Sequence, residues 1–206
     1  MDQFISVHGV AGHAVLLDCQ TTDHGLVALP KGLKIVAVNT MVQHDLAGSA
    51  YHVRTDECNA VVAALEDRYP DVGSLRDASL EMLEWIERDV TEVHLRRAKH
   101  VITENKRVER FVKACEAGNL TRMKKLMWES HESLRDDYEV SCAELDFLAE
   151  FAQDLPGVWG ARMTGGGFGG CTVNLVEEQH VAEFESRVLK AYHDRFGIDA
   201  QLFVCE

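Results

Sequence analysis

The chain has 206 residues, of which 46% are hydrophobic, and its formal net charge is −13 at pH 7. This length suits one large domain or two small ones, and the apolar fraction is enough for a packed core, which argues against disorder. The acidic balance argues against nucleic-acid binding, and no run approaches the roughly 20 apolar residues of a membrane span.

The first part of the chain predicts a short helix, a hairpin and a central strand. A helix begins at Asp2, where a carboxylate suits the cap or first turn. Two β-rich runs separated by polar turn residues, His13 to Cys19 and Gly25 to Leu29, predict a β-hairpin. After the break at Pro30, the run from Leu33 to Asn39 is apolar enough to be a central strand.

The middle of the chain predicts a series of helices, because apolar residues recur there at helical spacing. Gly118 with Asn119 ends the longest of them. Ser141, with Glu144 three residues later, predicts a capping box at the start of the last. The expected helices run from about Tyr51 to Asp67, from Ser79 to Arg88, from Glu92 to Glu116, from Leu120 to Leu134, and from Ser141 to just before Pro156.

The C-terminal part predicts two strands, a helix and a final strand. These are expected at Val158 to Met163, Cys171 to Val176, Val181 to Phe196 and Ala200 to Val204. From Leu33 on, this order predicts an α+β fold: a ferredoxin-like split β-α-β sheet with a helical insertion in its first crossover. The hairpin before Leu33 does not fit that sheet, so we expect it to belong to another domain.

A glycine loop joins the second and third strands of this sheet. Five glycines stand between Gly165 and Gly170, and the loop formally reads G-x-G-x-x-G. The segment after it predicts a strand, whereas the dinucleotide fingerprint needs a helix there, and the lysine of a P-loop is missing. Both nucleotide-binding patterns are therefore rejected on context, and from the loop alone a plain glycine-rich hairpin remains an alternative.

Four segments together resemble the galactokinases of the GHMP kinase superfamily. The segments follow one another in the right order, and the resemblance covers essentially all of the chain: Met1 to Gly9 (MDQFISVHG), Val42 to Cys58, Ser130 to Asp146 and Arg162 to Val173 (RMTGGGFGGCTV). The resemblance implies transfer of the γ-phosphate of ATP to the C1 hydroxyl of galactose, with Mg²⁺.

The resemblance also implies the roles of particular residues. Asp2 falls on the catalytic aspartate, which takes the proton of the sugar hydroxyl and contacts the sugar, and Tyr51 falls on a sugar-contacting tyrosine. The glycines of the loop are implied to support the nucleotide site: Gly165, Gly166, Gly167, Gly169 and Gly170. Without the resemblance, a helix cap is the favoured interpretation of Asp2, and a half-buried packing residue that of Tyr51.

The chain departs from the family in lacking a match to its N-terminal half. That half carries the main phosphate loop and the Mg²⁺-binding acid, so the chief ATP and Mg²⁺ ligands have no counterpart here, and we assign no metal ligand. Residues 1–31 are expected to be a remnant of the N-terminal kinase domain, and residues 32–206 the GHMP kinase C-terminal domain. Since the phosphate loop and the metal ion supply most of the catalysis of phosphoryl transfer, we predict that the chain alone is inactive.

Two other functions stay open: a related sugar kinase, and a non-catalytic sugar-sensing or partner-binding module. Expected partners are galactose, ATP and either a separate N-terminal half or a second copy, because the hairpin would leave an unpaired edge and apolar surface. The six scattered cysteines favour reduced thiols in the cytoplasm. Cys171 is expected to be a buried thiol, and the histidines to be surface or core residues.

Overall fold

The computed structural model describes residues 2–43 and 47–205, with the side chains of residues 2, 3, 43 and 47–49 outside that description. Strands β1 (His13–Leu17) and β2 (His24–Ala28) form an antiparallel hairpin. A separate four-stranded sheet has the order β4-β5-β3-β6, and all its neighbouring strands are antiparallel. Its strands are β3 (Leu33–Gln43), β4 (Val158–Thr164), β5 (Gly169–Glu177) and β6 (Gln201–Cys205).

This strand order is the ferredoxin-like topology that the sequence predicts. The first strand of the sheet, β3, lies between the third and the fourth, so that Val36 pairs with Asn174 on β5 and with Val204 on β6. Alternate side chains of a strand point to opposite faces. Val36 is fully buried on one face and its neighbour Ile35 packs on the other, which explains why β3 is apolar from Ile35 to Val38.

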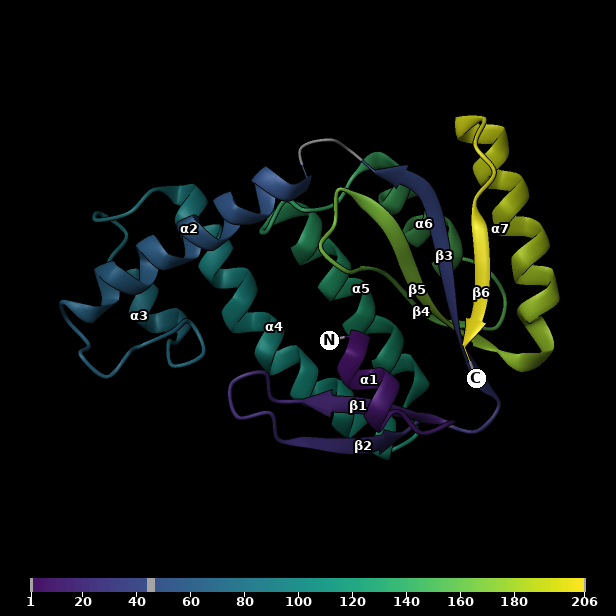
Figure 1. The fold of residues 1–206 in the computed structure, drawn as a ribbon, viewed down its shortest axis with the longest axis horizontal. Helices are drawn as coiled ribbons and strands as arrows, with labels where there is room; N and C mark the ends of the chain where they lie inside the picture. Colours follow the sequence, from purple (N-terminus) through teal and green to yellow (C-terminus); the bar gives the residue numbers. More distant parts are fainter. Residues whose placement is uncertain (1, 44–46, 206) are drawn as a thin grey trace.

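Helices α6 (Ala143–Gln153) and α7 (Val181–Phe196) cover one face of the sheet (Figure 1). Phe184, Val188 and Tyr192 of α7 are buried there in the largest apolar cluster. The hydroxyl of Tyr192 donates to the carbonyl oxygen of Thr40 at 2.9 Å, so its polar group is satisfied inside the core. We call this side of the sheet the closed face.

The opposite face is covered by α5 (Leu120–Asp136), the end of α4 (Glu92–Glu116) and the hairpin. Val27 of β2 packs there with Met127 of α5 and Leu175 of β5. Contact between the hairpin and the helices is incomplete, because a largely apolar cavity of about 250 Å³ lies between them. The hairpin also leaves Leu16 and Leu26 exposed, at 40% and 48%.

A helical lobe projects away from the sheet, at the left of Figure 1. It comprises α2 (Ala47–Glu66), α3 (Leu80–Glu84) and the first part of α4. Val61, Ile86 and Ile102 belong to its core. The hydroxyl of Thr91 accepts from the backbone N–H of His94 at 3.2 Å and so caps α4. Because α4 packs against both α2 and α5, it ties the lobe to the sheet.

Three local expectations are wrong. Helix α6 has Cys142 at its N-cap, without a side-chain capping bond, because the Ser141 hydroxyl donates to Asp146 Oδ1 at 2.5 Å instead. Helix α5 continues to Asp136, where the charged run suggested a connector, and α3 is shorter than expected. A short 3₁₀ turn, η1 (Glu178–His180), precedes α7.

Across the described residues, we find no helix with the length and hydropathy that a membrane crossing requires.

Candidate active site

The glycine loop is a turn between two strands, β4 and β5, as its context predicts. Its tip is exposed at Gly165 and Gly166, and an added Cβ at either position would meet no atom within 4 Å among the residues that the structure describes. Gly165 has φ +83°, a conformation that L side chains rarely adopt. The tip therefore presents bare backbone, which another group is able to approach closely.

The other end of the loop is locked against the rest of the chain. The backbone N–H of Phe168 donates to the carbonyl oxygen of Val140 at 2.7 Å. A Cβ at Gly167 would lie 2.0 Å from that same oxygen, and Gly167 has φ +84°. Glycine is thus required at 167 by both space and backbone conformation. Half of the loop is fixed, and half is free to face a ligand.

Tyr51 stands in the first turns of α2, with 60% of its side chain surface exposed. Its ring lies edge-on to His52, with ring centroids 6.3 Å apart. A half-buried packing role is therefore excluded, and the phenol is available for contact with a ligand. The preceding residues 44–46, which include His44 of the same motif, lie outside the described part of the chain.

Asp2 belongs to helix α1 (Asp2–His8), but its side chain lies outside the described residues, so its catalytic role stays a prediction. The helix is held on the hairpin by aromatic contacts. Phe4 meets the His24 ring of β2 edge-on with ring centroids 5.1 Å apart, and the His8 ring lies 4.3 Å from the same His24 ring. Strand β2 therefore fixes the position of the helix that carries Asp2.

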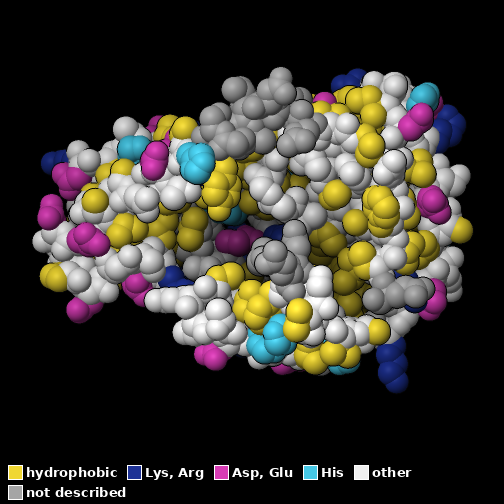
Figure 2. Space-filling view, in the orientation of Figure 1, with side chains coloured by type: hydrophobic (Ala, Val, Ile, Leu, Met, Phe, Trp, Pro, Cys, Tyr) yellow, Lys and Arg dark blue, Asp and Glu magenta, His cyan; other side chains and the backbone are white. Residues whose placement is uncertain are grey.

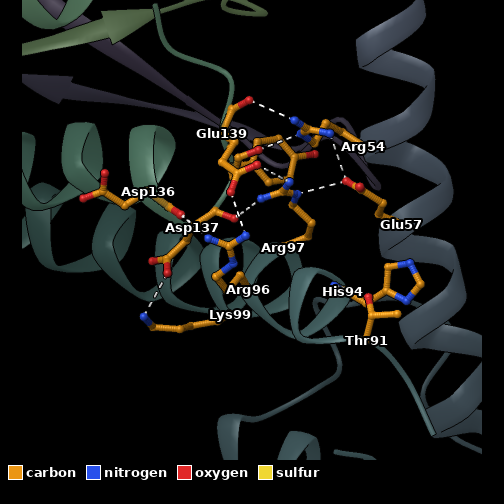
Figure 3. A network of polar contacts seen from close by, with 11 residues as sticks. Arg54, Glu57, Thr91, His94, Arg96, Arg97, Lys99, Asp136, Asp137 and Glu139 are labelled. Carbon is orange, nitrogen blue, oxygen red and sulfur yellow. Dashed lines mark hydrogen bonds and ion pairs between the residues drawn. The ribbon is translucent and has the colours of Figure 1, made fainter.

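A buried arginine network holds residues 137–140, which follow α5 and which we call the connector (Figure 3). Arg97 of α4 is 2% exposed. It donates to Glu57 of α2 at 2.9 Å, to the carbonyl oxygen of Asp137 at 2.6 Å and to the carboxylate of Glu139 at 2.7 Å. A planar guanidinium with five N–H donors suits such a divergent set of acceptors.

Arg54 of α2 holds the next two carbonyl groups of the connector. It donates to the carbonyl oxygens of Tyr138 at 2.6 Å and Glu139 at 2.9 Å, and also to Glu57 at 3.1 Å. Arginines are favourably placed at the end of α5, because its unpaired carbonyl groups carry partial negative charge. The guanidinium of Arg97 lowers the pKa of Glu139, which keeps that carboxylate charged.

The sequence did not reveal this network. Its bonds join charged residues of α2 and α4 to the connector, across as many as 85 residues of sequence. The one local indication is that Arg97 stands four residues before Val101, and therefore borders the apolar stripe of α4. The resemblance covered Ser130 to Asp146 as a motif without indicating what that motif does.

His131 supports the strand that leads into the glycine loop. It is fully buried, and its Nδ1 accepts from the backbone N–H of Met163 at 3.2 Å. Nε2 lies 3.3 Å from Asp146 Oδ1, without hydrogen-bond geometry. His131 is thus a core histidine, as expected, and the motif around it holds both β4 and the loop in place.

Burial also sets the protonation of two further groups. It lowers the pKa of His100 to about 4, and the ring stacks on Tyr138 of the connector with centroids 4.6 Å apart. Burial raises the pKa of the Cys171 thiol, which favours the neutral thiol over a thiolate nucleophile, but the residue is half-buried and not buried as expected. Nowhere in residues 2–43 and 47–205 do three or more potential metal ligands gather.

A polar cluster stands at one end of the apolar cavity. Arg162 of β4 donates to Glu104 Oε1 at 3.0 Å and to the hydroxyl of Ser130 at 2.7 Å, and Arg107 also pairs with Glu104. Figure 2 shows this side of the molecule hollowed between the helical lobe and the sheet. Because the two arginines exceed the one acid, this end of the cavity carries positive charge in an otherwise acidic chain.

Comparison with known proteins identifies relatives over the whole chain. The family described as GHMP kinases C terminal matches residues 111–194. The chain is 44% identical to the galactokinase of Roseiflexus sp. (strain RS-1) over 205 residues, and 49% identical to that of Homo sapiens over 208 residues. These matches cover 100% of this chain but 52% and 50% of those proteins, so the chain spans about half the length of the curated relatives it matches.

Solved structures agree with these matches. The crystal structure of Lactococcus lactis galactokinase complexed with galactose is similar with a TM-score of 0.86 and 38% identity, over 94% of this chain and 50% of that one. L. major mevalonate kinase in complex with R-mevalonate is similar with a TM-score of 0.54 and 18% identity, over 93% of this chain and 48% of that one. The second likeness concerns the fold alone.

Proposed function

We propose that this chain, which contains a GHMP kinase C-terminal domain and corresponds to a C-terminal portion of galactokinases, forms one wall of a galactokinase active site. The reaction is transfer of the γ-phosphate of ATP to the C1 hydroxyl of galactose. The observation that carries the proposal is the asymmetry of the glycine loop. Its flank is locked by Val140, whereas at its tip, Gly165 and Gly166, no atom of the described residues comes within 4 Å of an added Cβ, so the backbone there is bare.

In this proposal the described residues bind and orient the substrates, and Asp2 is the predicted general base. Tyr51 contacts the sugar with its exposed phenol, and Asp2 accepts the proton of the attacking hydroxyl. The glycine tip packs beside the phosphate loop that binds ATP, without being that loop. Because the described residues gather no set of metal ligands, we assign no step of the reaction to Mg²⁺ in this chain.

We further propose a division at residue 31. Residues 1–31 are assigned to the N-terminal kinase domain, because the hairpin forms its own sheet and does not join the four-stranded one. Residues 32–206 are the C-terminal domain.

The cysteines at 19, 58, 115, 142, 171 and 205 are all unpaired, which supports the predicted cytoplasmic location.

The test is a coupled kinase assay with galactose, ATP and Mg²⁺. The chain is assayed alone and mixed with a separately produced N-terminal half of the Roseiflexus galactokinase. We expect no turnover from either part alone and turnover from the mixture, lost in the Asp2→Asn variant but retained in the control variant Asp23→Asn on the hairpin turn. Turnover by the chain alone would refute its predicted dependence on a second half.

Two further outcomes separate the alternatives. Turnover with another sugar, but not with galactose, would favour a related sugar kinase. Binding of galactose by calorimetry without turnover in any mixture would favour the non-catalytic module.

A further inference from the structure

The connector touches both parts of the proposed site. At one end, Arg54 of α2 holds the carbonyl groups of Tyr138 and Glu139, and Tyr51 stands one helical turn before Arg54. At the other end, the carbonyl oxygen of Val140 holds the backbone N–H of Phe168 in the glycine loop. The sugar-contacting helix and the loop are therefore bound to the same short segment.

Successive carbonyl groups of the connector are taken by groups from other elements. The oxygen of Asp137 accepts from Arg97, those of Tyr138 and Glu139 accept from Arg54, and that of Val140 accepts from the loop. Backbone without regular structure is normally mobile unless its polar groups are bonded. Glu139 also has φ +52°, a conformation that an L residue keeps only when its surroundings enforce it.

From this geometry we propose that Arg54 and Arg97 are positioning residues that set the distance between the sugar-contacting helix α2 and the glycine loop. The inference rests on the proposed function, because only that function gives Tyr51 and the loop a shared substrate. Arg97 fixes the connector to α4 and, through Glu57, to α2. Arg54 fixes the connector to α2 directly, and Val140 transmits that position to Phe168.

The chemistry requires arginine at both positions. Arg97 bonds two carboxylates and one backbone oxygen, and Arg54 bonds one carboxylate and two backbone oxygens. The planar fork of N–H donors on a guanidinium suits such sets, and an ammonium group offers no such fork. Removing the buried Arg97 would take one ion pair each from Glu57 and Glu139, which keep Arg54 and Arg96 as partners. It would also remove the donor to the Asp137 carbonyl oxygen and risks unfolding the chain. Arg54 is the better position for a test, because its side chain is 12% exposed and lysine keeps its charge.

The test measures hydrogen exchange of the Phe168 amide in the 206-residue chain by NMR. In the Arg54→Lys variant we expect exchange at Phe168 to rise about tenfold, the effect of losing roughly one to two backbone hydrogen bonds. Exchange of the Val36 and Val38 amides of β3 should change less than about twofold, because both residues are fully buried inside the sheet. Two controls are matched: Arg187→Lys makes the same change in an exposed pair on α7, and Val61→Ala weakens the lobe core without touching the connector.

The outcome separates positioning from general stabilisation. If exchange at Phe168 rises no more than exchange in β3, or rises equally in Val61→Ala, Arg54 merely stabilises the fold and the proposal fails. An unprotected Phe168 amide in the wild-type chain would also overturn it.

A second readout uses the reconstituted kinase. Arg54→Lys should alter KM for both galactose and ATP, whereas Tyr51→Phe should alter KM for galactose alone. A galactose-only effect of Arg54→Lys would contradict the coupling. If the wild-type mixture is inactive, the proposed function fails while the exchange measurement still decides whether the arginines position the loop.

Discussion

The closed face of the sheet and the connector are held in place by opposite means. On the closed face, Phe184, Val188 and Tyr192 pack against the strands as an apolar core. The connector, by contrast, has only one buried residue of this kind, Val140, and is held by arginine bonds to its carbonyl groups. Apolar packing has little directionality and stabilises the whole domain. Charged hydrogen bonds fix the position of one backbone segment where no ladder does so.

The largest effect is expected on the closed face. Phe184→Ala removes a side chain that is 1% exposed and should lower the free energy of unfolding by about 3–5 kcal/mol, since the lost transfer free energy is increased by a cavity. Phe203→Ala on β6, where 51% of the side chain is exposed, should cost less than about 1 kcal/mol. Urea titration measures both. Equal losses would show that the closed face is not the main source of stability.

The contact between the connector and the loop comes next. Gly167→Ala places a methyl group 2.0 Å from the Val140 oxygen at φ +84°, and should cost about 2–4 kcal/mol. The added methyl group of Gly166→Ala meets no atom within 4 Å in the described part of the chain, so the change in stability should be no more than about 0.5 kcal/mol. Thermal unfolding of the two variants compares them directly. A tolerated alanine at 167 would mean that the connector yields, contrary to its description as a fixed segment.

Lowering the pH should reduce the stability that the polar groups around the connector contribute before it affects that of the apolar core. The pKa of His100 is about 4 in the folded chain against 6.5 for a free histidine, so the unfolded chain binds the proton first. Stability is therefore lost as pH falls from 6.5 toward 4, by about 2 kcal/mol between pH 7 and pH 5. The lowered pKa of Glu139 adds its loss only below its usual value of 4.5. Urea titrations at both pH values should show this loss in the wild type and not in His100→Gln.

The smallest effect is expected at the hairpin, which is covered neither by complete apolar packing nor by arginine bonds. Its exposed Leu26 should support self-association of the chain. Leu26→Glu should weaken association by about 1 kcal/mol, roughly fivefold, while Leu80→Glu on α3, at 40% exposure, serves as the control. Sedimentation velocity over a concentration series measures the change. A wild-type chain that stays monomeric throughout would remove the basis for this prediction.

The same contrast explains what the sequence was able to predict. The bounds of α4 and α7 agree with the structure at both ends, because helical periodicity and a following glycine are local patterns. The ferredoxin-like order followed from the order of the elements. The capping box predicted at Ser141 was wrong, because the Ser141 hydroxyl bonds Asp146 instead, a contact that the local capping pattern does not show.

The candidate site was only partly accessible from sequence. The resemblance selected Tyr51 and the glycines, and the structure adds that Tyr51 is exposed and that Gly167 is fixed by Val140. The arginine network depends on which charged side chains meet across three elements, and no spacing along the chain encodes that. Asp2, whose side chain lies outside the described residues, still rests on the resemblance.

The order of the sheet has a consequence for synthesis on the ribosome. Strand β3 lies between β5 and β6, so the amide of Asn174 that bonds the Val36 carbonyl is made 138 residues later. At bacterial and eukaryotic elongation rates this interval is on the order of 10 s. During that time the apolar strand from Leu33 to Val38 has neither of its final neighbours. The nascent chain should therefore be a substrate for chaperones until its last strand has left the exit tunnel.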